Sequence, residues 1–165
     1  MFMEKIGKLL IKTLITMTIF KKKINKKKFP LVTVDCVLFK FNSVLLIKRK
    51  FSPFKNFFAL PGGFVDVGET VEEACVREMK EETSINLKVN DLKLVGIYSN
   101  PRRDPRRSTI SISFYSEINK IISPKAGDDA IFAEFKENWQ KEKLAFDHKI
   151  IIKDSISKFR SDVKK

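Results

Sequence analysis

The pattern of hydrophobic and polar positions after residue 28 predicts a series of β-strands. Residues 29–41 and 44–50 are rich in β-branched and aromatic side chains, and Asn42 and Ser43 separate them, so the two runs predict a β-hairpin. Residues 51–60 are dense in phenylalanine and predict a loop or a short strand. Further strands are expected, in chain order, at residues 86–89, 92–98, 108–117 and 130–135.

Two other stretches have the spacing of helices. Residues 70–83 follow a glycine-rich turn and predict a helix, and residues 147–163 place Ile151, Phe159 and Val163 at helical spacing. Strands before and after the first helix, with the second helix at the end, predict an α/β fold with a mixed β-sheet packed between helices. We find no internal repeat and no linker, so residues 29–163 are expected to form one domain.

Residues 1–28 differ from the rest in charge. They hold nine lysines and one acidic residue, in a 165-residue chain with 33 basic residues, 20 acidic residues and a net charge of +13. Lys5, Lys8 and Lys12 fall on one helical face and apolar residues on another, which predicts a basic amphipathic extension. Its apolar stretches are shorter than the roughly 20 residues that a membrane-spanning helix needs. Three interpretations stay open: peripheral contact with an anionic membrane, a short signal-like sequence, or an extension without a role.

Composition limits which binding partners and which cellular compartment we expect. The basic extension has lysine without interleaved arginine or tyrosine, so we expect no specific nucleic-acid binding. Two cysteines, Cys36 and Cys75, are too few for a disulfide framework and indicate buried thiols of a reduced, cytoplasmic protein. Fifteen phenylalanines predict a phenylalanine-rich core.

An acidic segment lies within the first predicted helix. Glu78, Glu81 and Glu82 stand at i, i+3 and i+4, so their carboxylates share one helical face. Like charges placed this way repel, and Mg²⁺ or Mn²⁺ would offset the repulsion, since both prefer carboxylate oxygens, backbone carbonyls and water. Arg77 can reach back along the helix to hold the carboxylate of Glu69. The alternative is a solvated acidic face with no ligand.

This segment resembles the Nudix box, the pattern G-x5-E-x7-R-E-U-x-E-E-x-G-U in which U is aliphatic. The matching residues are Gly63, Glu69, Arg77, Glu78, Met79, Glu81, Glu82 and Ile85. Ser84 departs from the pattern, because it stands where the second glycine is expected. A glycine there would end the helix in a left-handed conformation, so a serine costs on the order of 1 kcal/mol. A pattern of this length is far more specific than a short glycine motif.

The resemblance implies a three-layer α/β/α sandwich and metal-dependent hydrolysis of a nucleoside diphosphate linked to another group. It implies that Glu78 and Glu82 are the principal ligands of Mg²⁺ or Mn²⁺, and that the Gly62 carbonyl is a further ligand. Glu81 would be a ligand or a proton acceptor. Arg77 would support catalysis indirectly, by holding a neighbouring carboxylate. Relatives are often dimers, which makes a homodimer one expectation.

Segments outside the box indicate the substrate. Pro101 and the surrounding YSNPRRDPRR are similar to a loop that marks the ADP-ribose pyrophosphatase subgroup, and AGDDA (126–130) and LAFDH (144–148) resemble segments of the same subgroup. Arginine forks in such a loop suit a diphosphate or a terminal phosphate. We expect Arg103 to be the first substrate-binding arginine and Arg49, at the end of a strand, the second.

An extra acidic residue outside the box is also expected. Nudix enzymes commonly use one to bind a metal or activate water, and Asp128, Asp129 or Glu134 are the candidates here. A turn-capping role for the two aspartates is at least as plausible an interpretation.

Three other side chains have a structural and a functional interpretation. His148, the only histidine, is expected to start or pack a helix, with Asp147 as its cap, rather than to act as a base. Phe54 and Phe58 could stack on adenine, but a core position is favoured in so phenylalanine-rich a chain.

The expected reaction is hydrolysis of ADP-ribose to AMP and ribose 5-phosphate. One alternative is a sanitising hydrolase of damaged nucleoside triphosphates. Another, of a different class, is a non-catalytic nucleotide-sugar sensor or interaction module. The intact carboxylates of Glu78, Glu81 and Glu82 argue against the last, because a protein that only binds does not need that acidic cluster.

Overall fold

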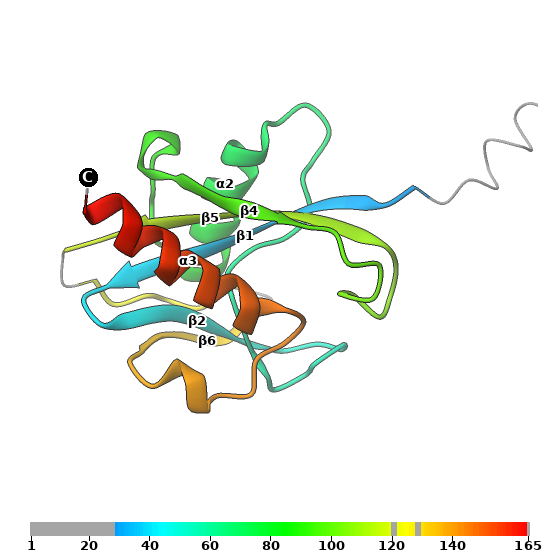
Figure 1. Ribbon diagram of the computed structural model, residues 1–165. Helices are drawn as coiled ribbons and strands as arrows, with labels where there is room; N and C mark the ends of the chain where they lie inside the picture. The colour runs from blue at the N-terminus through cyan, green and yellow to red at the C-terminus, as the bar shows by residue number, and fades with distance from the viewer. Residues whose placement is uncertain (1–28, 120–121, 128–129, 165) are drawn as a thin grey trace, which may run out of the picture.

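A mixed β-sheet lies between two α-helices in the computed structural model, which describes residues 29–119, 122–127 and 130–164 (Figure 1). The strands are β1 (Leu31–Lys40), β2 (Ser43–Arg49), β3 (Phe58–Ala59), β4 (Lys93–Tyr98), β5 (Thr109–Glu117) and β6 (Ala130–Lys136). The helices are α2 (Val71–Thr83) and α3 (His148–Val163), with short 3-10 helices η1 (Val89–Asp91) and η2 (Trp139–Lys141). The expected extension at residues 1–28 lies outside the described residues.

The centre of the sheet is a parallel pair. Strand β1 pairs with β5 in parallel from Leu31 opposite Thr109 to Phe39 opposite Glu117, and the other strand pairs are antiparallel. The strand order is β3-β2-β1-β5-β4, and β6 pairs with β2. The sheet is therefore mixed, as the sequence predicts.

Alternate side chains of β1 reach the two helices. Val34, Cys36 and Leu38 pack with buried residues of α2, whereas Val37 and Phe39 pack with buried residues of α3. Because side chains of a strand alternate between faces, the two helices cover opposite faces of the sheet. The expected three-layer α/β/α sandwich is confirmed (Figure 1).

Helix α2 begins at a capping box. The Thr70 side chain accepts a hydrogen bond from the Glu73 amide, and the Glu73 carboxylate accepts one from the Thr70 amide at 2.8 Å. The helix ends at Ser84, which adopts the left-handed conformation (φ 61°) that the box glycine would adopt. Two amides from the segment after β5 bind the last carbonyls, Lys125 to Thr83 and Gly127 to Glu82. The helix therefore ends where the pattern predicts, although a serine occupies the position.

Two predicted elements differ from the structure. Residues 86–89 do not form a strand, because the segment bonds to itself: the Lys88 amide donates to Asp91 Oδ2 at 3.1 Å, and η1 follows. Its alternating pattern reflects the burial of Ile85 and Leu87 under the core. The hairpin turn also lies one residue earlier than predicted, at Phe41 and Asn42, and residue 43 already belongs to β2.

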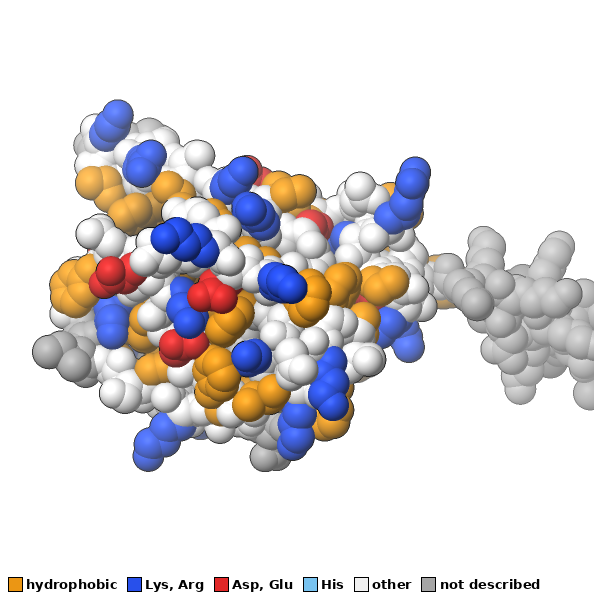
Figure 2. Space-filling view, turned by 90° about the horizontal axis from the view of Figure 1, so that it is seen from below, with side chains coloured by type: hydrophobic (Ala, Val, Ile, Leu, Met, Phe, Trp, Pro, Cys, Tyr) orange, Lys and Arg blue, Asp and Glu red, His pale blue; other side chains and the backbone are white. Residues whose placement is uncertain are grey.

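Basic side chains remain frequent on the described surface. Figure 2 shows Lys and Arg side chains spread between hydrophobic patches on the face seen from below, with few acidic side chains among them. In the described part of the chain, no helix combines the length and the apolar character needed to cross a membrane.

Candidate active site

Two glycines bring the chain close to both β1 and α2. After β3, the chain runs beside β1, and the amides of Cys36 and Val34 donate to the carbonyls of Pro61 and Gly63, each at 2.8 Å. A Cβ on Gly62 would lie 2.1 Å from the Val34 carbonyl oxygen, and a Cβ on Gly63 would lie 2.2 Å from a carboxylate oxygen of Glu78. The backbone contact at Gly62 requires glycine, and at Gly63 a side chain would push the Glu78 carboxylate away, so both glycines place this backbone against the acidic face of α2.

Arg77 is the centre of a hydrogen-bonded carboxylate group on α2. Its Nε and Nη2 donate to the two oxygens of Glu69 at 3.1 and 2.6 Å, and Nη1 donates to Glu78 at 2.9 Å and to Glu81 at 3.2 Å. Nη2 also donates to the Phe64 carbonyl at 2.9 Å. The bonds from Arg77 lower the pKa of Glu69 to about 2. The contacts are those of a residue that holds carboxylates in place.

Glu78 and Glu82 face the glycine segment. Glu82 Oε2 accepts a hydrogen bond from the Gly62 amide at 2.9 Å. Burial raises the pKa of Glu78, Arg77 opposes this effect, and the negative charge of Glu81 adds to it. A carboxylate in such surroundings gains from a nearby cation, since opposite charge favours the ionised form.

The donors suit a hard divalent cation, but they are not assembled around one point. In the described ranges, no group of three or more His, Cys, Asp or Glu side chains is arranged to hold a metal ion. Glu78 and Glu81 instead bind Arg77, and Glu82 binds the Gly62 amide. The two carboxylates nearest the glycines, Glu78 and Glu82, are the oxygen type that Mg²⁺ and Mn²⁺ prefer.

A cavity of about 420 Å³ brings these carboxylates together with arginines. It is lined by Ile47, Arg49, Phe51, Ser52, Gly62, Gly63, Phe64, Asp66, Arg77, Glu78, Glu82 and Arg106. The cavity therefore has carboxylates for a cation and guanidinium groups for an anion.

Arg49 and Arg106 flank one aromatic ring. The Arg49 Nε donates to the Pro53 carbonyl at 3.0 Å, and its guanidinium carbon lies 5.1 Å from the centre of the Phe146 ring. The Arg106 guanidinium carbon lies 5.8 Å from the same centre, and its Nη2 donates to Asp104 at 2.7 Å. The sequence indicated Arg49, but it did not separate Arg106 from the other loop arginines. The signal that distinguishes Arg106 is Asp104 two residues earlier, which holds its side chain.

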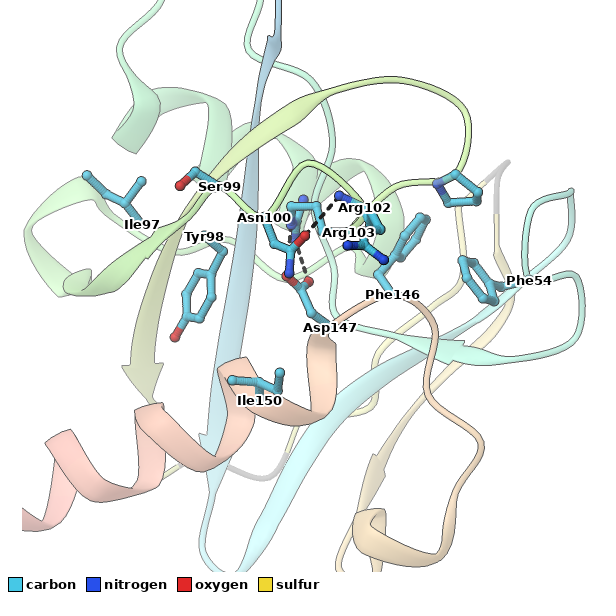
Figure 3. Close-up of a pocket in the computed structure, with 11 residues that line it drawn as sticks. Phe54, Ile97, Tyr98, Ser99, Asn100, Arg102, Arg103, Phe146, Asp147 and Ile150 are labelled. Carbon is cyan, nitrogen blue, oxygen red and sulfur yellow. Dashed lines mark hydrogen bonds and ion pairs between the residues drawn. The ribbon is translucent and has the colours of Figure 1, made fainter.

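A second cavity, of about 520 Å³, lies between the loop after β4 and the start of α3 (Figure 3). It is lined by Phe54, Ile97, Tyr98, Ser99, Asn100, Arg102, Arg103, Pro105, Phe146, Asp147 and Ile150. A smaller cavity, lined by Arg49, Arg103, Arg106 and Phe146 among others, shares residues with both. The three cavities therefore follow one another from Glu78 to Ile150.

Arg103 is placed differently from the expectation of a free phosphate-binding fork. Its side chain is only 5% exposed and binds the carboxylates of Asp35 and Asp147. These partners come from distant parts of the chain, so the burial of Arg103 could not be seen in the loop sequence. Pro101 is exposed at a turn, whereas Pro105 lines the 520 Å³ cavity.

The remaining predicted positions have mixed outcomes. Asp128 and Asp129 lie outside the described residues. Glu134 is on β6 with its carboxylate 2.9 Å from Lys136 Nζ, and it does not line the cavity of Glu78 and Glu82. The sequence suggested Glu134 from its nearness to the aspartates, which says nothing of where its side chain points.

The structural interpretation of His148 is confirmed. It is the first residue of α3, it is buried, and its Nδ1 accepts a hydrogen bond from the Leu60 amide at 2.8 Å. Asp147 stands at the cap position, but its side chain makes no cap bond because it binds Arg103. Phe58 is in the core as expected, whereas Phe54 lines the 520 Å³ cavity.

Comparison with known proteins identifies the family. The model of the NUDIX domain matches residues 30–155. The chain belongs to the Nudix family. An ADP-ribose pyrophosphatase of Methanocaldococcus jannaschii is 53% identical over 146 residues, which cover 82% of this chain and 83% of that relative.

Two further relatives extend the comparison. A protein of Acinetobacter baylyi called the ADPR responsive transcriptional repressor NtrR is 31% identical over 140 residues, which cover 80% of this chain and 55% of that relative. A bifunctional NMN adenylyltransferase/ADP ribose pyrophosphatase of Francisella tularensis, solved with AMP and a manganese ion, shares the Nudix fold. That match has a TM-score of 0.72 and 28% identity, and covers 92% of this chain and 48% of the other.

Proposed function

We propose that this Nudix protein hydrolyses ADP-ribose to AMP and ribose 5-phosphate with the help of Mg²⁺ or Mn²⁺. The observation that carries the proposal is the 420 Å³ cavity, where Glu78 and Glu82 lie with Arg49 and Arg106. A substrate with a diphosphate in its middle and a cation bound to it fits that charge pattern. The 53% identity to a protein called ADP-ribose pyrophosphatase supports the choice of substrate.

Glu78, Glu82 and the Gly62 carbonyl would hold the metal, with Glu81 as a further ligand or as a proton acceptor. A metal held there would supply positive charge beside the diphosphate and would make a bound water more acidic. If Glu78 or Glu81 turned from Arg77 Nη1 to a metal, Nη2 of Arg77 would still bind Glu69 and the Phe64 carbonyl. Helix α2 would therefore keep its position.

Arg49 and Arg106 would bind the diphosphate. Both line the 420 Å³ cavity, and a guanidinium fork offers two parallel donors to a phosphate. The 520 Å³ cavity would take the nucleoside half, because Phe54, Tyr98 and Phe146 offer aromatic surfaces beside polar backbone and side-chain groups.

A non-catalytic ADP-ribose sensor is a second candidate. The similarity to a repressor whose name describes it as ADPR responsive favours it. Hydrolysis of damaged nucleoside triphosphates is a third. Membrane contact through residues 1–28 and homodimer formation are separate proposals that fit any of the three.

Product analysis distinguishes the candidates. The full chain is incubated with Mg²⁺ and ADP-ribose, NADH, a diadenosine polyphosphate or oxidised dGTP, and the products are separated by chromatography. We expect AMP and ribose 5-phosphate from ADP-ribose at the highest kcat/KM. Preference for oxidised dGTP would contradict the substrate assignment, and binding of ADP-ribose without turnover would establish the sensor.

Glu82→Gln tests the metal assignment. We expect kcat to fall by at least about 100-fold, since even outer partners of metal ligands change activity 10–100-fold when they are lost. Glu137→Gln, at an exposed glutamate in the turn after β6, is the matched control and should keep wild-type turnover. Undiminished turnover by a folded Glu82→Gln variant would exclude Glu82 as a ligand.

A further inference from the structure

Arg103 belongs to a buried polar cluster that joins five parts of the chain. We define the cluster as Asp35 on β1, Arg103 in the loop after β4, Ser111 on β5, and Asp147 and His148 at the start of α3. The backbone amide of Leu60, after β3, also binds it through His148 Nδ1 at 2.8 Å. Strand, loop and helix positions around the cavities are therefore tied to one group of side chains.

The Arg103 guanidinium makes a two-point contact, or fork, with Asp147 and a further hydrogen bond to Asp35. Nε and Nη2 donate to the two oxygens of Asp147 at 3.0 and 2.8 Å, and Nη2 also donates to Asp35 at 3.1 Å. Nη1 lies 3.5 Å from the hydroxyls of Thr33 and Thr109. A two-point fork fixes the direction of the guanidinium as well as its distance, which a lysine ammonium cannot do.

The charges of the cluster stabilise the contacts of the Arg103 guanidinium with Asp147 and Asp35. The Asp35 carboxylate also accepts a hydrogen bond from Ser111 at 2.5 Å and lies 3.3 Å from His148 Nε2. His148 Nδ1 accepts a hydrogen bond from the Leu60 amide. The proton of the imidazole is therefore on Nε2, which faces Asp35. Burial would lower the pKa of Arg103, but Asp147 and Asp35 outweigh it and raise that pKa. The guanidinium therefore stays charged between two carboxylates.

The fork spans the two walls of the 520 Å³ cavity. One wall is the loop that contributes Asn100, Arg102 and Pro105, and the other is the start of α3, which contributes Phe146 and Ile150. Figure 3 shows Arg103 reaching from the loop to Asp147, with dashed lines between their side chains. The ion pair thus helps to set the separation of the walls, together with the hydrogen bond from the Tyr98 hydroxyl to Asp154 of α3 at 2.9 Å.

We infer that Arg103 is a positioning residue, which acts through Asp147 and Asp35 to set the shape of the nucleoside cavity and does not itself bind phosphate. The inference rests on the proposed function, because it assigns the nucleoside half of the substrate to that cavity. A direct phosphate ligand would need exposed donors, whereas the Arg103 side chain is 5% exposed and its guanidinium faces carboxylates.

Arg103→Lys tests this role, because lysine keeps the charge and loses the fork. We expect the KM for ADP-ribose and the inhibition constant of AMP to rise by about tenfold, as for the loss of an outer partner, while kcat stays within about twofold. The inhibition constant of inorganic pyrophosphate should not change, since Arg49 and Arg106 remain. Amides of residues 99–107 should exchange hydrogen faster than in the wild type.

Controls separate positioning from phosphate contact and from misfolding. Arg107→Lys, at an exposed arginine of the same loop, should match the wild type in all five measurements. If Arg103→Lys weakens pyrophosphate as much as AMP, Arg103 binds phosphate and the inference is wrong. Unchanged AMP inhibition and unchanged amide exchange would also overturn it.

A second variant covers the case in which Arg103→Lys does not fold. Asp147→Asn keeps the shape of the partner and weakens the fork, so it should raise the inhibition constant of AMP and speed amide exchange in the same loop. Wild-type values for a folded Asp147→Asn would overturn the inference. If the wild type fails to hydrolyse ADP-ribose, the proposed function fails, while AMP binding by calorimetry and amide exchange still decide the role of Arg103.

Discussion

Asp35 is a buried carboxylate held by several partners at once. Burial alone would raise its pKa, but His148, Arg103 and Ser111 outweigh burial and lower the pKa to about 2. A carboxylate whose pKa falls on folding stabilises the native state above its usual pKa of 3.8, and this contribution is lost as the pH falls toward 2. The cluster that shapes the nucleoside cavity is therefore also sensitive to acid.

Acid denaturation should report on this residue. Between pH 5 and pH 2 we expect Asp35 to account for a loss of about 2 kcal/mol in the free energy of unfolding, from a pKa shift of nearly two units. Urea denaturation at each pH measures the loss, and Asp35→Asn should remove that part of the pH dependence. The same pH dependence in Asp35→Asn and wild type would contradict the assignment.

At the scale of the element, the C-terminus of α2 is clamped by the segment after β5. The amide of Gly127 donates to the Glu82 carbonyl at 3.0 Å, and the amide of Lys125 donates to the Thr83 carbonyl at 2.9 Å. A Cβ on Gly127 would lie 1.9 Å from the Glu81 carbonyl oxygen. The clamp thus requires glycine, and it acts on the turn of α2 that carries Glu81 and Glu82.

Gly127→Ala should loosen the clamp. We expect the free energy of unfolding to fall by about 1–3 kcal/mol, the usual range for overpacking, and the amides of the last turn of α2 to exchange faster. Chemical denaturation and hydrogen exchange measure the two effects. Gly96→Ala is the matched control, since a Cβ there would meet only Tyr98 at 3.9 Å. Equal losses in both variants would show that the clamp contributes nothing specific.

Local contacts were predictable from the sequence, and distant ones were not. The helix at residues 70–83 was expected and is observed at 71–83, because its capping box and its carboxylate spacing are local. The bond between Arg77 and Glu69 is also short-range in the chain, since it joins the helix to the turn just before it. Arg103 finds its partners 44 and 68 residues away, so its loop sequence gave no sign of burial.

The same reasoning explains the incorrect strand. Ile85 and Leu87 alternate with polar residues, and alternation reports which side chains are buried, not whether the backbone pairs with a neighbour. The bond from the Lys88 amide to Asp91 then satisfies the backbone locally. The prediction of the fold class is still correct, because the long strands and both helices have stronger hydrophobic patterns than residues 86–89.

For the whole molecule, charge is concentrated at one end of the sequence. Residues 1–28 contain nine lysines and one glutamate, whereas residues 29–165 contain 24 basic and 19 acidic residues. An anionic lipid surface attracts such a segment by about 1 kcal/mol for each lysine near it, and salt weakens the attraction. Membrane contact, if it occurs, should therefore depend on the first 28 residues.

Vesicle sedimentation tests this dependence. We expect more of the full chain than of residues 29–165 to sediment with vesicles that contain phosphatidylserine, and the difference to vanish at high salt. Neutral phosphatidylcholine vesicles are the control and should sediment neither form. Equal partitioning of both forms onto the anionic vesicles would rule out surface contact through the extension.

The buried cluster also bears on the order in which the protein can be made. Ser111 follows Asp35 by 76 residues, and His148 follows Leu60 by 88, so the central strand β1 is synthesised long before its parallel partner β5 and before α3. Pairings of such separation form slowly and leave strand edges exposed on incomplete chains. Helix α3, which follows all the described strands of the sheet in the chain, delivers Asp147 and His148. Translation that stops short of it would leave the pair of Arg103 and Asp35 without Asp147 and His148, so we expect an unfinished chain to be a target for quality control.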